Sequence, residues 1–130
     1  MMIKTVLASS MGLALTAGAA LACDTAATAD ASVVEVVEFR LAEGANQKDF
    51  MASVAALEAS FLCNAPGYVS RTLTQSEDGV WLDMVYWTSL DEALAAADAI
   101  MTDDSAMSFM QAIDPESIDM AHWPIVSQAN

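Results

Sequence analysis

The chain has 130 residues, of which 55% are hydrophobic and 17% charged, and its 18 acidic and 4 basic residues give a formal net charge of −14. This length suits one domain with one core, and the apolar content is too high for a disordered chain. The acidic balance excludes nucleic acid as a partner and disfavours anionic membrane surfaces, because both present phosphates.

The first 22 residues have the pattern of a bacterial export signal. Lys4 supplies a positive charge, an uncharged stretch over 6–22 follows, and Ala20-Leu21-Ala22 has the form of an A-x-A cleavage site. The alternative, a membrane anchor, is disfavoured because the apolar run is short and rich in small residues. We therefore expect residues 1–22 to be a signal peptide, and the mature protein to be periplasmic or secreted.

Cleavage after Ala22 would leave Cys23 at the start of the mature chain, which also contains Cys63. Two cysteines in an oxidising compartment suggest one disulfide. Two alternatives stay open. Both thiols could be free, or Cys23 could carry a lipid, although the residues before it match a lipoprotein signal only with a shift of one position. Only a lipidated Cys23 would attach this protein to a membrane.

The mature chain begins with a small, polar leader over 23–31, and a Val-rich segment over 32–41 predicts the first strand. Asn46 is a typical N-cap for the helix that follows. Asn64-Ala65-Pro66-Gly67 then predicts its end. The apolar face of this helix consists of Phe50, Val54, Leu57 and Phe61, which recur with helical spacing.

Segments 68–75 and 80–87 predict two strands of a hairpin, joined by the turn Ser76-Glu77-Asp78-Gly79. Ser89 and Glu92 form a capping box for a second helix. A short helical turn from Asp103 and a last strand over 117–123 complete the domain, which we place at 32–125, with a tail over 126–130. The order β-α-β-β-α-β predicts an α+β ferredoxin-like sandwich, in which a four-stranded antiparallel sheet carries both helices on one face.

The two central strands of such a sheet, the first and third, carry apolar residues on both faces. Two helices can cover only one face, so the other would expose Val and aromatic side chains to water. A second copy packed face to face would cover it, which predicts a homodimer. The alternative is a monomer whose leader or tail lies over the open face.

Four short segments of the chain form a pattern found in a known superfamily. They are Glu35-Val36-Val37-Glu38-Phe39-Arg40-Leu41, Pro66-Gly67-Tyr68, Asp78-Gly79 with Trp81, and Trp87 with Ser89 and Glu92-Ala93. On these residues the chain resembles the dimeric α/β-barrel superfamily, and specifically its small antibiotic-biosynthesis-monooxygenase-like proteins. The resemblance covers roughly 32–123 and consists mainly of turns and caps. It implies a dimeric α/β-barrel and, among the activities of that superfamily, cofactor-free oxidation of small aromatic molecules.

The hairpin register decides which side chains could form a pocket. If Gln75 pairs with Val80, one face of the hairpin is aromatic and polar and suits a pocket or an interface. The other face, which includes Leu82, Met84 and Tyr86, would then be the core beneath the helices. The side chains of the first face are Tyr68, Ser70, Thr72, Thr74, Trp81, Asp83, Val85 and Trp87.

Two residues are candidates for acid–base chemistry. Asp83 is a carboxylate in the middle of an apolar strand, where burial would raise its pKa and suit it to accept a proton. Its alternative role is structural, as the partner of Thr72, Arg40 or Arg71. His122 is the one His of the chain and could deprotonate a phenol, or could be a half-exposed residue on an edge strand.

Tyr68, Trp81 and Trp87 are the candidate ligand-binding residues, with dimer packing as their alternative role. The sequence has no spacing typical of a metal site or a phosphate-binding loop, so we expect neither a metal nor a cofactor. Two functions remain. The first is a cofactor-free monooxygenase or isomerase-like enzyme that acts on a small aromatic molecule. The second is a non-catalytic exported dimer that binds a small molecule or acts in stress.

Overall fold

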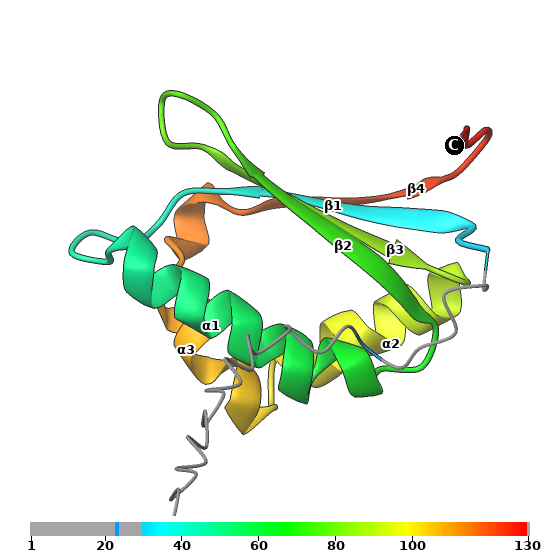
Figure 1. Ribbon diagram of the computed structural model, residues 1–130, viewed down its shortest axis with the longest axis horizontal. Helices are drawn as coiled ribbons and strands as arrows, with labels where there is room; N and C mark the ends of the chain where they lie inside the picture. Colours follow the sequence, from blue (N-terminus) through cyan, green and yellow to red (C-terminus); the bar gives the residue numbers. More distant parts are fainter. Residues whose placement is uncertain (1–22, 24–29, 130) are drawn as a thin grey trace, which may run out of the picture.

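A twisted antiparallel sheet lies over a layer of helices in the computed structural model, which describes Cys23 and residues 30–129 (Figure 1). The strand order is β2-β3-β1-β4, so β1 and β3 are central, as the element order predicts. The predicted α+β ferredoxin-like class is therefore confirmed. The strands are β1 (Val33–Phe39), β2 (Tyr68–Gln75), β3 (Trp81–Trp87) and β4 (Asp119–Pro124).

The helices begin where the sequence supplies caps. The Asn46 side chain accepts the Asp49 backbone N–H, and the Ser89 side chain accepts that of Glu92. Both caps satisfy backbone donors that a helix start leaves without partners. The helical elements are α1 (Gln47–Ser60), η1 (Leu62–Asn64), α2 (Leu90–Ile100), η2 (Asp104–Ala106), α3 (Met107–Gln111) and η3 (Pro115–Ser117).

The hairpin between β2 and β3 has a different register from the predicted one. The backbone of Ser76, not Gln75, pairs with Val80, and Gln75 lies opposite Trp81. The loop is therefore one residue shorter than the sequence suggested. Gly79, with φ of +86°, takes the left-handed conformation that such a short loop requires.

A β-bulge in β2 then changes which side chains face the helices. The register shifts between Tyr68, which lies opposite Trp87, and Ser70, which lies opposite Tyr86. Beyond this shift, Arg71 lies opposite Val85. A bulge inserts one unpaired residue and so reverses the side-chain alternation of its strand. Tyr68 and Arg71 therefore share one face of the sheet, although an odd number of positions separates them.

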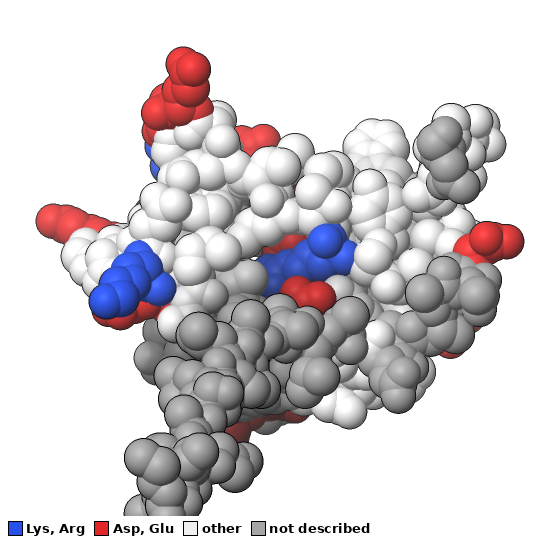
Figure 2. Space-filling view, in the orientation of Figure 1, with Lys and Arg blue, Asp and Glu red and all other residues white. Residues whose placement is uncertain are grey.

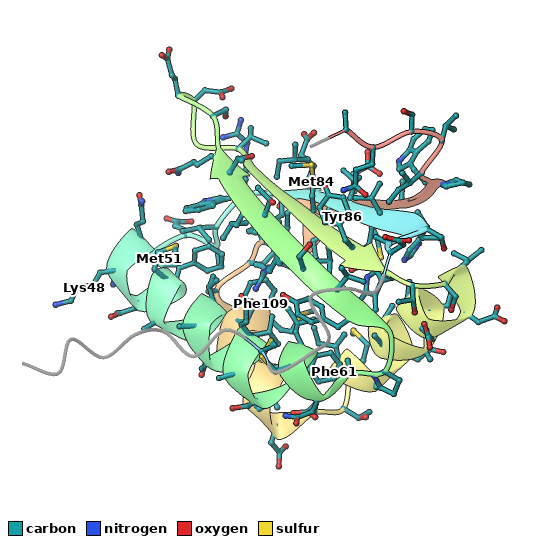
Figure 3. The ribbon with its side chains drawn as sticks, turned by 45° about the vertical axis from the view of Figure 1, so that its right-hand side comes forward. Lys48, Met51, Phe61, Met84, Tyr86 and Phe109 are labelled. Carbon is teal, nitrogen blue, oxygen red and sulfur yellow. A yellow bond between two sulfur atoms is a disulfide. The ribbon has the colours of Figure 1, made fainter. Side chains whose placement is uncertain are left out.

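The predicted assignment of the two sheet faces is also wrong. Trp81, Asp83, Val85 and Trp87 alternate as the buried residues of β3 and face the helices. Leu82, Met84 and Tyr86 occupy the open face instead. In Figure 3, Met84 and Tyr86 lie on the side of the sheet away from the helices, whereas Phe61 and Phe109 lie between the two layers.

The structure joins Cys23 to Cys63 by a disulfide, with Cα atoms 5.0 Å apart. Cys63 belongs to η1, and Cys23 packs against the core at this point. The predicted signal peptide over 1–22 and the remainder of the leader over 24–29 lie outside the described residues. Within the part of the chain that is described, no helix combines the length and apolar character needed to span a bilayer.

Removing the disulfide should lower stability. Cys23 and Cys63 are 40 positions apart in sequence, and closing a loop of this size contributes about 3–4 kcal/mol in the chain-entropy model. We expect Cys63→Ser to unfold at a lower urea concentration than the oxidised protein. Cys23→Ser should unfold at the same concentration as Cys63→Ser, because both variants lack the same disulfide. Unchanged unfolding midpoints under reducing and oxidising conditions would show that the cross-link does not stabilise the domain.

Candidate functional site

A cavity of about 110 Å³ lies between the covered face of the sheet and the helices. Most of its wall is apolar, and the charged groups enter from the sheet. Figure 2 shows blue and red side chains meeting in the middle of this view, with uncharged residues above them and to their right. The lining residues are Glu35, Val37, Phe39, Leu57, Phe61, Leu62, Arg71, Asp83, Val85, Trp87, Ala96, Ala97, Ile100, Met101, Phe109, Met110, Ile113, Ile118 and Met120.

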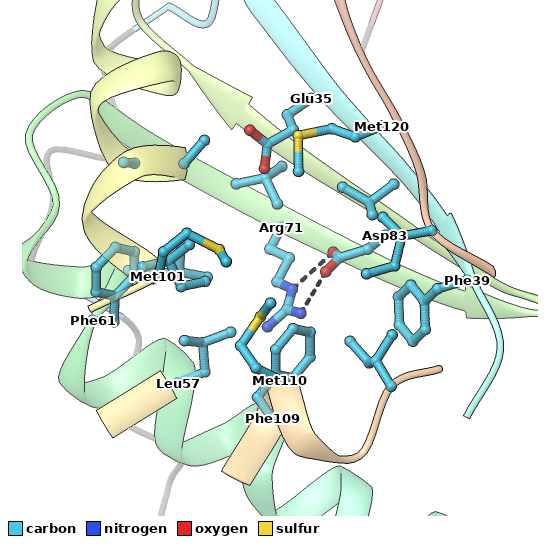
Figure 4. Close-up of a pocket in the computed structure, with 18 of the residues that line it drawn as sticks. Glu35, Phe39, Leu57, Phe61, Arg71, Asp83, Met101, Phe109, Met110 and Met120 are labelled. Carbon is cyan, nitrogen blue, oxygen red and sulfur yellow. Dashed lines mark hydrogen bonds and ion pairs between the residues drawn. The ribbon is translucent and has the colours of Figure 1, made fainter. Parts of the chain in front are cut away.

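Arg71 and Asp83 form a buried ion pair at this cavity (Figure 4). Arg71 Nε donates to Asp83 Oδ1 at 2.8 Å, and Nη2 donates to Oδ2 at 2.5 Å. Their side chains are only 3% and 7% exposed. The Phe109 ring lies 5.2 Å from Arg71 Cζ, within range of a cation–π interaction. The guanidinium is thus held in one orientation by two hydrogen bonds and a ring.

The third nitrogen of this guanidinium has no partner. Arg71 Nη1 is buried and makes no hydrogen bond with any described residue, and the same is true of Trp87 Nε1. Both residues line the cavity. A buried donor without an acceptor costs about 1–3 kcal/mol, and more when it is charged. The cavity is therefore equipped to bind an oxygen atom that carries full or partial negative charge.

A second polar pair lies across the two neighbouring strands β1 and β4. His122 Nε2 is 2.7 Å from Glu35 Oε2, and the side chains are 15% and 12% exposed. Burial raises the pKa of Glu35 above its usual value, and the negative charge of Asp83 adds to this. The hydrogen bond and charge of His122, and the charge of Arg71, oppose the increase in this pKa. Glu35 is therefore a stronger proton acceptor than an exposed carboxylate.

The strand register places these groups in one line across the sheet. His122 pairs with Glu35, Glu35 with Val85, and Val85 with Arg71. We call these four residues the cross-sheet row. Directly opposed residues in antiparallel strands project on the same face, so all four side chains point toward the helix layer. Val85 lies between Glu35 and Arg71, and all three line the cavity.

The structure brings some of the predicted site residues together and separates others. Asp83 and Trp87 line the cavity. His122 does not line it, but His122 contacts the side chain of Glu35, which does. The two other candidates for ligand binding do not line it. Tyr68 donates its hydroxyl to Glu58 at 2.9 Å, and Trp81 packs against Phe39 and Phe50 in the core. Each lies on the covered face near an end of its strand, away from the middle of the sheet.

The sequence reasoning missed Glu35 altogether, and it treated Arg71 only as a partner of Asp83. The alternation Val33, Glu35, Val37, Phe39 in β1 could have indicated Glu35, because this face of a central strand is otherwise fully apolar. Arg71 carried no such signal, because its position opposite Val85 depends on the register of the hairpin. Among the described residues, no group of three or more His, Cys, Asp or Glu could hold a metal.

No family model matches the chain, and neither does any curated protein. Solved structures do match the chain in fold. A protein of Bordetella bronchiseptica assigned to the antibiotic biosynthesis monooxygenases is 18% identical, with a TM-score of 0.62, over 75% of this chain and 100% of that one. A variant of SnoaB, a cofactor-independent oxygenase of Streptomyces nogalater, is also 18% identical, with a TM-score of 0.61, over 76% and 97%.

A third match is a monooxygenase from the gene ActVA-Orf6 of Streptomyces coelicolor, solved in complex with nanaomycin D. It is 15% identical, with a TM-score of 0.55, over 77% of this chain and 92% of that one. This chain has the fold of the antibiotic-biosynthesis-monooxygenase proteins. The resemblance that the turns and caps suggested is confirmed at the level of fold. At identities of 15–18%, this likeness is one of fold.

The buried ion pair should show strong coupling in a double-mutant cycle. Arg71→Met alone leaves Asp83 as an unpaired buried charge, which typically costs about 3–5 kcal/mol. We expect the double variant Arg71→Met/Asp83→Leu to recover most of this loss, because neither charge then remains. Urea unfolding of the protein, the two single variants and the double variant measures the coupling. Additive losses would contradict the pairing.

Proposed function

We propose that the cavity binds a small aromatic molecule with a hydroxyl group, and that the protein oxidises this molecule with O2 without a cofactor. The observation that carries the proposal is that Arg71 Nη1, at a largely apolar cavity, has no hydrogen-bond partner among the described residues. A fixed cation in such surroundings stabilises negative charge on a ligand oxygen far more than water would. The similarity in fold to a cofactor-independent oxygenase and to a ligand-bound monooxygenase supports the same reaction class.

The size of the cavity limits the ligand. Its volume of about 110 Å³ is close to the roughly 150 Å³ of an engineered cavity that binds benzene. A compound with one ring is therefore the appropriate probe. The aromatic and thioether side chains of Phe109, Met101 and Met110 line the same space and suit contact with a flat ring (Figure 4).

The proposed reaction balances without a cofactor. A phenol that reacts with O2 gives a quinone and water, with one oxygen atom entering the ring and the other leaving in the water. The substrate supplies all four electrons. Loss of the hydroxyl proton makes the ring electron-rich and so prepares it to react with O2. Arg71 stabilises the resulting anion, and the apolar wall excludes water from it.

An oxygen electrode tests this function with a series of one-ring phenols and hydroquinones. We expect O2 uptake above that of heat-denatured protein, with one labelled atom from ¹⁸O2 in the product. Arg71→Met/Asp83→Leu, which should stay folded, ought to lose about 10²–10³-fold in kcat, as removal of an oxyanion donor does.

Saturable binding of these phenols without O2 uptake would instead support the second candidate, a non-catalytic binding protein. Tryptophan fluorescence measures that binding independently of turnover, because Trp87 lines the cavity. Equal O2 uptake by the protein and by the double variant would contradict the role given to Arg71.

We also propose that the protein is exported and acts as a homodimer. The pattern of residues 1–22 and the Cys23–Cys63 disulfide support export, because disulfides persist in oxidising compartments. The open face of the sheet supports the dimer. Met84 and Tyr86 lie on this face, and the neighbouring Trp123 is 59% exposed. A second sheet packed against this face would remove these side chains from water.

A charge on the open face should dissociate the dimer. We expect sedimentation velocity at low micromolar concentration to show a dimer for the protein and a monomer for Tyr86→Lys. Met51→Lys is the matched control, because Met51 is 43% exposed on α1, on the other side of the molecule. A monomeric unmodified protein, or a dimer that tolerates Tyr86→Lys, would contradict this interface.

A further inference from the structure

Glu35 and Arg71 lie on either side of Val85 in the cross-sheet row, two strand spacings apart. Neighbouring strands are about 4.8 Å apart, so the backbones of the two residues are separated by roughly 10 Å. Their side chains line the same cavity, and Val85 lies between them in its wall. A ligand ring that lies over Val85 therefore has Glu35 on one side and Arg71 on the other.

Of the two carboxylates that line the cavity, only Glu35 has an oxygen without a hydrogen bond from a described residue. Both oxygens of Asp83 accept hydrogen bonds from Arg71. Glu35 uses Oε2 for His122, and no hydrogen bond is described for its Oε1. His122 lies on the edge strand β4, so the pair extends from the cavity to the edge of the sheet. The carboxylate predicted from the sequence, Asp83, is thus the partner of Arg71, and Glu35 is the group free to act.

We infer that Glu35, supported by His122, is the catalytic base that accepts the hydroxyl proton of a ligand whose oxygen is bound by Arg71. The inference rests on the proposed function for the chemical class of the ligand. The O–H bond breaks, its proton moves to Glu35 Oε1, and the electron pair stays on the ligand oxygen beside Arg71 Nη1. His122 is a positioning residue, because it contacts Glu35 and does not line the cavity.

The charges at the site define which ligands it accepts. Two carboxylates, Glu35 and Asp83, lie beside one permanent cation, Arg71. A permanent anion would add a third negative charge to this group, which electrostatic repulsion disfavours. A neutral phenol adds no charge and can give its own proton to Glu35. The site therefore selects neutral weak acids over carboxylates of the same shape.

The probe for this inference is para-nitrophenol, whose phenolate absorbs visible light and whose neutral form does not. Bound to the purified protein, it should ionise at a pH about one unit lower than in solution, a tenfold change in the ionisation ratio. In Glu35→Gln this shift should disappear, while para-nitroanisole, which has no proton to give, should bind equally to both proteins. His122→Asn should reduce the shift without removing it. We expect para-nitrobenzoate to bind at least tenfold more weakly than para-nitrophenol.

A full spectral shift in Glu35→Gln, or para-nitrobenzoate binding as tight as that of para-nitrophenol, would overturn the inference. The ionisation measurement needs no O2, so it tests the role of Glu35 independently of the proposed oxidation. If the spectral shift depended on Glu35 but no phenol caused O2 uptake, only the proposed oxidation would be contradicted. If Glu35→Gln retained the O2 uptake of the unmodified protein, only the role of Glu35 as the base would be contradicted. If neither para-nitrophenol nor para-nitroanisole bound to the folded protein, the cavity would not be the site, and both proposals would fail.

Discussion

The buried ion pair between Arg71 and Asp83 is the interaction on which the site depends. Transferring these two charges from water into the interior costs several kcal/mol for each ion, and only close, doubly hydrogen-bonded contact offsets that cost. The geometry that provides this contact uses two of the three guanidinium nitrogens and both carboxylate oxygens. It leaves one donor, Nη1, at the cavity with its direction fixed. The pair thus positions a positive charge beside apolar surface, where it interacts strongly with a ligand oxygen.

The order and type of the elements could be predicted from the sequence because local signals determine them. Asn46 and Ser89 do cap the two helices, and the apolar spacing in α1 matches a buried face. The register of the hairpin could not be predicted. One residue fewer in the loop changed which residues of β2 share a face with Asp83 and Val85, and the bulge after Tyr68 places Tyr68 on that same face. Both depend on how β2 packs against β3. A local pattern carries little information about such a shift.

The same limitation explains the result for the candidate site. Asp83 and His122 could be selected because an acid in a central strand and the chain's one His are unusual for their positions. Both are at or beside the cavity, and each is paired with a group the sequence reasoning did not assign to the site. Arg71 comes from β2 and Glu35 from β1, so neither is adjacent in sequence to its partner. Pairing across strands determines their roles. Arg71 was one of three partners that the sequence left open for Asp83, whereas the pairing of Glu35 with His122 becomes visible only in the fold.

The cavity and its charges also explain why this small domain needs a cross-link. A cavity removes packing contacts, and an unpartnered buried donor reduces stability further. The excess of acidic residues adds repulsion between like charges. The Cys23–Cys63 disulfide acts at η1, whose Leu62 lines the cavity next to Cys63. The cross-link therefore restrains this wall of the cavity, and it offsets part of the stability that the polar interior costs.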